Sequence, residues 1–76
     1  MRTIVYRLKE KKKCCGERRF SEKTRNPVIT GLEPNKVYEL REKDCDWSRA
    51  QECMANDEGK ISLYIYSEGF SCTAGG

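Results

Sequence analysis

The 76-residue chain contains no histidine, only two prolines and no long apolar run. Without an imidazole to act as a base, Ser-His and Cys-His nucleophile pairs are excluded. Cys-x-x-Cys pairs are also missing, and with them the usual zinc-finger spacing. No apolar stretch approaches the ~20 residues of a membrane-spanning helix, and no glycine-rich loop would cradle phosphates. We therefore expect a protein that is not an enzyme and has no membrane partner.

Length and composition indicate one small, polar domain. Charged residues make up 36% and hydrophobic residues 37% of the chain, which is polar but not a disordered composition. We expect a single domain over residues 1–70 and a flexible tail over 71–76. The first residues lack the apolar segment of a signal peptide, so the cytoplasm or a virus particle is expected rather than secretion.

Alternating apolar residues predict an all-β fold of five to six short strands. The clearest strand lies at 61–66, where Ile61, Leu63 and Ile65 share one face. The turn before this strand has Gly59 at a position that needs positive φ. It predicts a hairpin that joins a strand at 49–55 to the strand at 61–66. Residues 11–26 are expected to form a basic loop, with at most a short strand over 18–21. The other expected strands lie at 3–9, 28–32, 36–43 and 49–55.

A corner follows the second of these strands. Pro34 fixes its own φ and donates no hydrogen bond, so the strand through Ile29 ends there. Beyond the turn, Tyr38 and Leu40 share one face of the next strand. An ordinary hairpin with a half-buried tyrosine is the plainer interpretation of this segment.

The pattern Ile-x-x-Leu-x-Pro-x-x-x-Tyr-x-Leu, over residues 29–40, resembles the corner of fibronectin type III and immunoglobulin-like domains. The resemblance implies a small antiparallel β-sandwich in which the hydroxyl of Tyr38 bonds to backbone a few residues upstream. Such domains have seven strands in roughly 100 residues, so we expect a truncated version here or a different small β-fold.

Five cysteines occur, at positions 14, 15, 45, 53 and 72. Cys45 and Cys53 flank a loop and are candidates for one disulfide, and Cys15 or its neighbour Cys14 for a second with Cys72. Five reduced thiols are an equal alternative. A four-cysteine zinc site would use Cys14, Cys15, Cys45 and Cys53, although adjacent ligands fit one tetrahedral ion poorly.

Basic residues concentrate in the first third of the chain. They are candidates for contact with nucleic acid or an acidic partner, or for a solvated edge where charge discourages strand pairing. Only Phe20 is available there for base stacking. The candidate basic patch comprises Lys11, Lys12, Lys13, Arg18, Arg19, Lys23 and Arg25.

We expect a protein-binding or structural accessory module, such as a component of a virus particle or another large assembly. Aromatic residues dominate interface energetics, and the candidate contacts are Trp47, Tyr64, Tyr66 and Phe70. The alternative is that these rings form a second core face, which for Tyr64 and Tyr66 is an equal alternative. The main alternative is a cysteine-ligated zinc module whose basic arm binds nucleic acid. A third hypothesis is a role for Cys14 as a reactive thiol, or for the terminal Gly75-Gly76 in ubiquitin-like conjugation.

Overall fold

The computed structural model describes residues 2–12 and 14–73, with the backbone alone at positions 14 and 15. Within these residues the chain forms seven strands and one short 3-10 turn, η1, so the all-β prediction is confirmed. The predicted tail over 71–76 lies partly outside the described residues. Gly75 and Gly76, on which the conjugation hypothesis depends, lie entirely outside them. The elements are β1 (Arg2–Leu8), β2 (Cys14–Phe20), β3 (Val28–Ile29), β4 (Val37–Glu42), η1 (Trp47–Arg49), β5 (Gln51–Met54), β6 (Ile61–Tyr66) and β7 (Gly69–Cys72).

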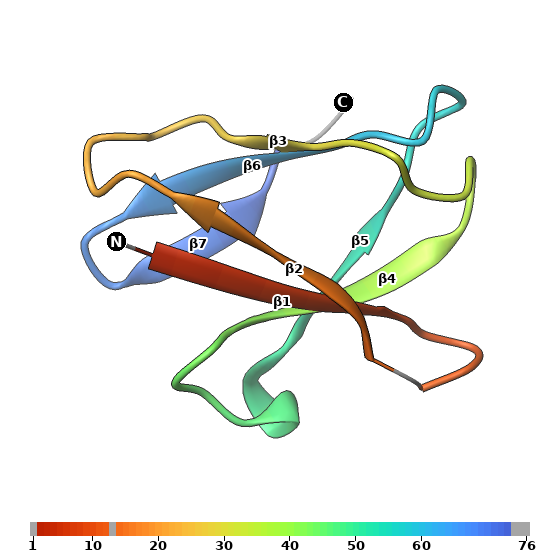
Figure 1. The fold of residues 1–76 in the computed structure, drawn as a ribbon, viewed down its shortest axis with the longest axis horizontal. Coiled ribbons are helices and arrows are strands. Elements are labelled where there is room, and N and C mark those ends of the chain that lie inside the picture. The colour runs from red at the N-terminus through yellow and green to blue at the C-terminus, as the bar shows by residue number, and fades with distance from the viewer. Residues whose placement is uncertain (1, 13, 74–76) are drawn as a thin grey trace.

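Two antiparallel sheets enclose one core. The first has the strand order β2-β1-β4-β5 and the second β3-β6-β7, and Figure 1 shows how the strands of the two sheets cross. Side chains alternate along each strand, so one face of each sheet turns inward. Ile4 and Leu40 from the first sheet and Ile29 and Leu63 from the second are fully buried.

The corner predicted at Pro34 carries the chain from one sheet to the other. β3 belongs to the three-stranded sheet and β4 to the four-stranded sheet, so the ordinary hairpin is wrong. Tyr38 is buried, and its hydroxyl accepts a hydrogen bond of 2.9 Å from the backbone N–H of Glu33. Asn35 turns the chain with a φ of 60°. The hydrogen bond between the Tyr38 hydroxyl and upstream backbone, which the resemblance implied, is therefore present.

The structure differs from the sequence prediction at β2, which occupies much of the expected basic loop. This strand pairs with β1 alone, with Gly16 opposite Tyr6 and Arg18 opposite Ile4. Glu17, Arg18 and Arg19 are all exposed. An edge strand that is exposed in this way has no apolar alternation, which is why the pattern was missed.

The turn before β6 is present, but the predicted hairpin is wrong. Gly59 has a φ of 74°, and its N–H donates to the carbonyl of Asn56 at 3.0 Å. The flanking strands nevertheless lie in different sheets, because β5 pairs with β4 and β6 pairs with β3 and β7. The turn is thus a second crossing between the sheets, opposite in direction to the Tyr38 corner.

Candidate protein-binding surfaces

The outer face of β6 carries two exposed tyrosines. Tyr64 and Tyr66 are 43% and 41% exposed, whereas the residues that alternate with them, Ile61, Leu63 and Ile65, are buried. The two rings stack, with centroids 6.2 Å apart and an angle of 27° between their planes. The exposure of both side chains agrees with the expectation, and their role as contacts stays a prediction.

Small residues lie opposite these rings on β7, and an exposed valine lies on the same face on β3. On β7, Ser71 lies opposite Tyr64 and Gly69 lies opposite Tyr66. On β3, Val28 is 46% exposed and pairs with Ser62. No bulky cross-strand neighbour therefore shields the rings within the described strands. We call the surface formed by Val28, Tyr64 and Tyr66 the tyrosine face.

Trp47 lies on the opposite side of the molecule and is half-buried. The guanidinium carbon of Arg7 lies 3.9 Å from the centre of an indole ring, and that of Arg41 lies 4.6 Å from it. Arg41 also donates to the carbonyls of Lys43 and Cys45, each at 2.9 Å, which fixes the loop before Trp47. Such cation–π contacts stabilise by about 0.5–2 kcal/mol.

This layer of arginine and tryptophan explains a buried valine. Val5 pairs with Arg41 on the outer face of the four-stranded sheet, yet it is only 5% exposed and lies outside the core cluster. Its cross-strand neighbour Arg41 contacts Trp47, and we infer that the layer of Arg7, Trp47 and Arg41 covers Val5. We therefore assign Trp47 a structural role, which differs from the exposed contact expected from the sequence.

Phe70 is not an exposed contact residue. It is 5% exposed, pairs with Ile65 and belongs to the core cluster. The prediction was wrong because the domain was expected to end at residue 70, with no strand after it. The chain instead continues as β7, and Phe70 is the residue of that strand that points into the core.

The predicted basic patch is spread over the surface. Lys11 and Lys12 lie in the turn between β1 and β2, whereas Lys23 and Arg25 follow β2 at its other end. A seven-residue strand separates these two groups by roughly 20 Å. Lys13 lies outside the described residues. The segment therefore does not form the single basic loop that was expected for nucleic acid.

Arg18 and Arg19 point to different faces of β2. Arg18 lies over the Tyr6 ring at 5.4 Å, and its two terminal nitrogens donate to the carbonyls of Glu17 and Thr30. It thereby joins the edge of one sheet to the other sheet. Arg19 lies on the outer face, opposite Thr3, and only a weak contact of 3.7 Å links it to Glu17.

The disulfide joins different residues from those expected. Cys53 on β5 bonds to Cys72 on β7, with a Cα–Cα distance of 6.0 Å. Cys45 is a free, half-buried thiol. The expected Cys45–Cys53 pairing is wrong because Cys53 points into the core toward β7, whereas Cys45 lies in the loop after β4. The disulfide links the two sheets where the strand ladders do not.

This bond also bears on the zinc alternative. A disulfide sulfur is not a thiolate, so Cys53 is lost from the four proposed ligands. The side chains of Cys14 and Cys15 lie outside what the structure describes, which leaves Cys45 as the single described thiol of that set. Over the described side chains there is no group of three or more His, Cys, Asp or Glu residues placed to hold a metal ion.

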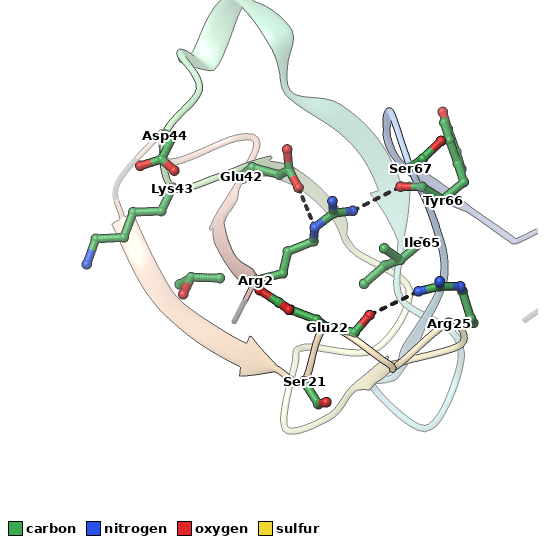
Figure 2. Close-up of a pocket in the computed structure, with 11 residues that line it drawn as sticks. Arg2, Ser21, Glu22, Arg25, Glu42, Lys43, Asp44, Ile65, Tyr66 and Ser67 are labelled. Carbon is green, nitrogen blue, oxygen red and sulfur yellow. Dashed lines mark hydrogen bonds and ion pairs between the residues drawn. The ribbon is translucent and has the colours of Figure 1, made fainter.

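A polar hollow of about 440 Å³ opens at the end of the sandwich where β1 begins. Figure 2 shows Arg2 at its centre, with its Nε 2.9 Å from Glu42 and its Nη1 donating to the Tyr66 carbonyl at 3.1 Å. The lining has three basic and three acidic side chains, so its formal charge cancels. Arg2 thus joins the two sheets at this end. We interpret the hollow as a result of this packing and do not assign it as a binding site.

The pKa of Lys9, which follows β1, is shifted by a carboxylate. Lys9 Nζ lies 2.7 Å from Glu52 Oε2, and this hydrogen bond and the carboxylate charge raise the pKa of Lys9 above its ordinary value of 10.5. A raised lysine pKa keeps the ammonium charged at neutral pH and does not create a base. The contact links the residue that follows β1 to β5, across β4.

Comparison with known proteins gives no relative. No protein-family model, curated protein or solved structure matches this chain. Among the described residues, no helix has the length and apolar character required to span a membrane. The functional argument therefore depends on the surfaces themselves.

Proposed function

We propose that this protein is a non-enzymatic binding module that contacts a protein partner through the tyrosine face. The observation that carries the proposal is the stacked pair of Tyr64 and Tyr66, each more than 40% exposed on a regular strand. Tyrosine brings a large apolar ring and a polar hydroxyl to an interface at low entropic cost, and it is enriched among residues that dominate binding energy.

The rigidity of the face supports the same proposal. Tyr64 and Tyr66 belong to β6, which pairs with strands on both sides, and the intervening Ile65 is anchored in the core. The rings are also held against each other, so little side-chain freedom remains to be lost on binding. A partner that covers them also reaches the serines beside them, because a stable interface buries about 800 Å² on each protein.

The fold supports a place among the immunoglobulin-like and fibronectin-like sandwiches. Its bond between Tyr38 and the backbone of Glu33, at a corner between two sheets, is the feature that these domains share. Seven strands divided four and three also match an immunoglobulin constant-type domain. The strand order differs. Here the strand before the corner, β3, pairs with β6, which comes after the corner in the chain. In those domains the strand before the corner pairs with strands that come earlier in the chain.

We propose an accessory subunit of a large assembly, such as a virus particle, as the setting. The test uses a photo-crosslinking residue at position 64, applied in an extract of the source cells. A matched probe at position 54 replaces Met54, which is 63% exposed on the other sheet. We expect a protein that crosslinks to position 64 only and is lost when Tyr66→Ser is added.

Two outcomes of that test would overturn the proposal. One is a set of crosslinked proteins that is identical for positions 64 and 54, which would show nonspecific contact. The other is a specific product at position 64 whose yield does not change with Tyr66→Ser, which would show that the stacked pair does not contribute. The variant is expected to fold because the hydroxyl and ring of Tyr66 are exposed.

A further inference from the structure

The free edge of the four-stranded sheet is a second binding surface, separate from the tyrosine face. β2 forms this edge, and within the described chain it pairs only with β1. From its geometry and charge we infer that β2 accepts an extended, acidic segment of a partner protein as an additional strand. This inference goes beyond the proposed function, because it concerns a different sheet.

The hydrogen-bond pattern identifies which groups of β2 are directed outward. On β1, the Thr3 carbonyl accepts from Lys43, and the N–H of Lys9 donates to Val37, so the odd-numbered residues of β1 bond to β4. The even-numbered residues must then bond to β2, because backbone groups alternate in direction along a strand.

The even-numbered residues of β1 face Gly16, Arg18 and Phe20 of β2. The backbone N–H and C=O groups of Glu17 and Arg19 therefore point away from β1, toward the free edge. The Glu17 carbonyl accepts one hydrogen bond from the side chain of Arg18 at 3.1 Å and retains a second lone pair. These two residues can form the alternating pairs of bonds that an antiparallel neighbour requires.

Charge decides which kind of strand fits. Residues 9–25 contain eight basic and three acidic side chains, whereas the rest of the chain contains seven basic and nine acidic ones. The net charges are thus +5 for this segment and −2 for the remainder. A second copy would bring two segments of the same sign together, which opposes pairing of β2 with itself. A segment of negative charge is attracted to the edge.

The positions of Glu17 and Arg19 also specify a pattern. Both side chains lie on the outer face of the sheet, and Arg19 is only weakly held by Glu17. Cross-strand pairs of opposite charge are favourable, and like charges are unfavourable. The incoming strand is therefore expected to place an acidic residue opposite Arg19 and a neutral or basic residue opposite Glu17. An antiparallel second copy would also make these two pairs, but it would bring together two segments of net charge +5, which a negatively charged segment does not.

The first experiment uses a short peptide rich in threonine and valine with one central glutamate, and the same peptide with lysine in that place. Nuclear magnetic resonance of the intact protein would measure the affinity for each peptide by titration. It would also measure the rate of hydrogen exchange at each backbone amide, with and without peptide. We expect the glutamate peptide to slow exchange at the amides of Glu17 and Arg19. The amide of Arg18, which already faces β1, should be protected with or without peptide. The lysine peptide should bind at least fivefold more weakly, because the net positive charge of residues 9–25 repels it and because its lysine would lie opposite Arg19.

The second experiment separates strand addition from simple charge attraction. Glu17→Pro removes an outward N–H and places a ring at the edge, without removing a bond to β1. Glu17→Thr removes the same negative charge but retains the N–H. We expect Glu17→Thr to bind the glutamate peptide as tightly as the unmodified protein or more tightly, and Glu17→Pro to lose binding. Arg19→Glu should reverse the preference between the two peptides.

The inference is overturned by any of three results. Equal binding to Glu17→Pro and Glu17→Thr would show charge attraction without strand addition. Slow exchange at the Glu17 and Arg19 amides in the free protein at low concentration would show that the edge is already closed. Concentration-dependent protection of those amides without peptide would assign the edge to a second copy. Tyr64→Ser with Tyr66→Ser should leave peptide binding unchanged, so that failure here and failure of the proposed function are distinguishable.

Discussion

The hydroxyl of Tyr38 lies 2.9 Å from the backbone nitrogen of Glu33, which donates to it. Tyr38 begins the inward-facing row of β4, whereas Glu33 lies in the crossing from β3. One bond therefore joins the loop between the sheets to the core of the four-stranded sheet. The ring of Tyr38 meets that of Tyr6 edge to face at 6.0 Å, which holds the hydroxyl in position.

Removal of this hydroxyl should destabilise the fold. In Tyr38→Phe the ring remains buried but the N–H of Glu33 loses its partner, so we expect a loss of about 1–2 kcal/mol in the free energy of unfolding. Tyr64→Phe is the matched control, because its exposed hydroxyl should cost less than about 0.5 kcal/mol. Urea denaturation of both variants measures the difference, and equal midpoints would contradict the role assigned to the corner.

Two glycines with similar backbone angles should differ in their tolerance of alanine. Gly31 and Gly59 have φ values of 77° and 74°. A Cβ at Gly31 meets no atom within 4 Å, whereas one at Gly59 would overlap the carbonyl oxygen of Leu32. We expect Gly31→Ala to cost about 1 kcal/mol, from the left-handed conformation alone.

Gly59→Ala should cost at least about 2 kcal/mol more, because the Leu32 carbonyl is backbone and cannot move aside without shifting the loop. Thermal unfolding of the two variants gives the comparison. A smaller loss for Gly59→Ala than for Gly31→Ala would show that the turn at 56–59 does not approach Leu32 in solution.

Loss of the disulfide should destabilise the contact between β5 and β7. The bond between Cys53 and Cys72 closes a loop across 19 positions, for which loop-closure entropy in the unfolded chain predicts about 3 kcal/mol of stabilisation. We expect Cys53→Ala with Cys72→Ala to lower the free energy of unfolding by this amount. Cys45→Ala, which removes the free thiol, is the control and should change stability by less than about 1 kcal/mol.

Alkylation of the folded, unreduced protein checks the pairing directly. Peptide mapping should find Cys53 and Cys72 unmodified before reduction and modified after it. Modification of both residues without a reductant would contradict the pairing. A peptide that joins Cys45 to Cys53 would restore the arrangement that the sequence alone favoured.

Trp47 should contribute to stability through its two arginine neighbours and its cover of Val5. Trp47→Ala removes the ring between Arg7 and Arg41, and we expect a loss of about 2 kcal/mol, less than for a fully buried tryptophan. Trp47→Phe keeps an aromatic ring and should lose less than half as much. Guanidinium denaturation is unsuitable because of its ionic strength, so urea is preferred. No change in Trp47→Ala would return this residue to the set of candidate contacts.

Some of the fold follows directly from local sequence. Alternation in β1, β4 and β6 is strong because one side of each strand faces the core and carries its apolar residues, and the period-2 pattern is the direct consequence. The corner is equally readable, since Pro34 ends one strand and Tyr38 begins the inward row of the next. These signals need only the residues within each segment.

The missed features all depend on residues outside the segment concerned. β2 has no buried apolar row, and β1 alone makes it a strand. Phe70 lies near the end of the chain, and only its pairing with Ile65 shows that it belongs to the core. Alternation places Tyr64 and Tyr66 on one face of β6 but does not decide whether that face is exposed. The half-buried state of Trp47 depends on Arg7 and Arg41, which come from two other strands.

The sequence by itself determined that the chain forms short strands, turns at Pro34 and Gly59, and places the two tyrosines of β6 on one face of that strand. These properties follow from backbone restriction and from the two-residue period of a pleated strand. Tertiary structure alone decided which strands share a sheet, that Cys53 meets Cys72, and that β2 presents Glu17 and Arg19 at a free edge. Those outcomes depend on how two sheets pack over one core, and no single segment contains that information.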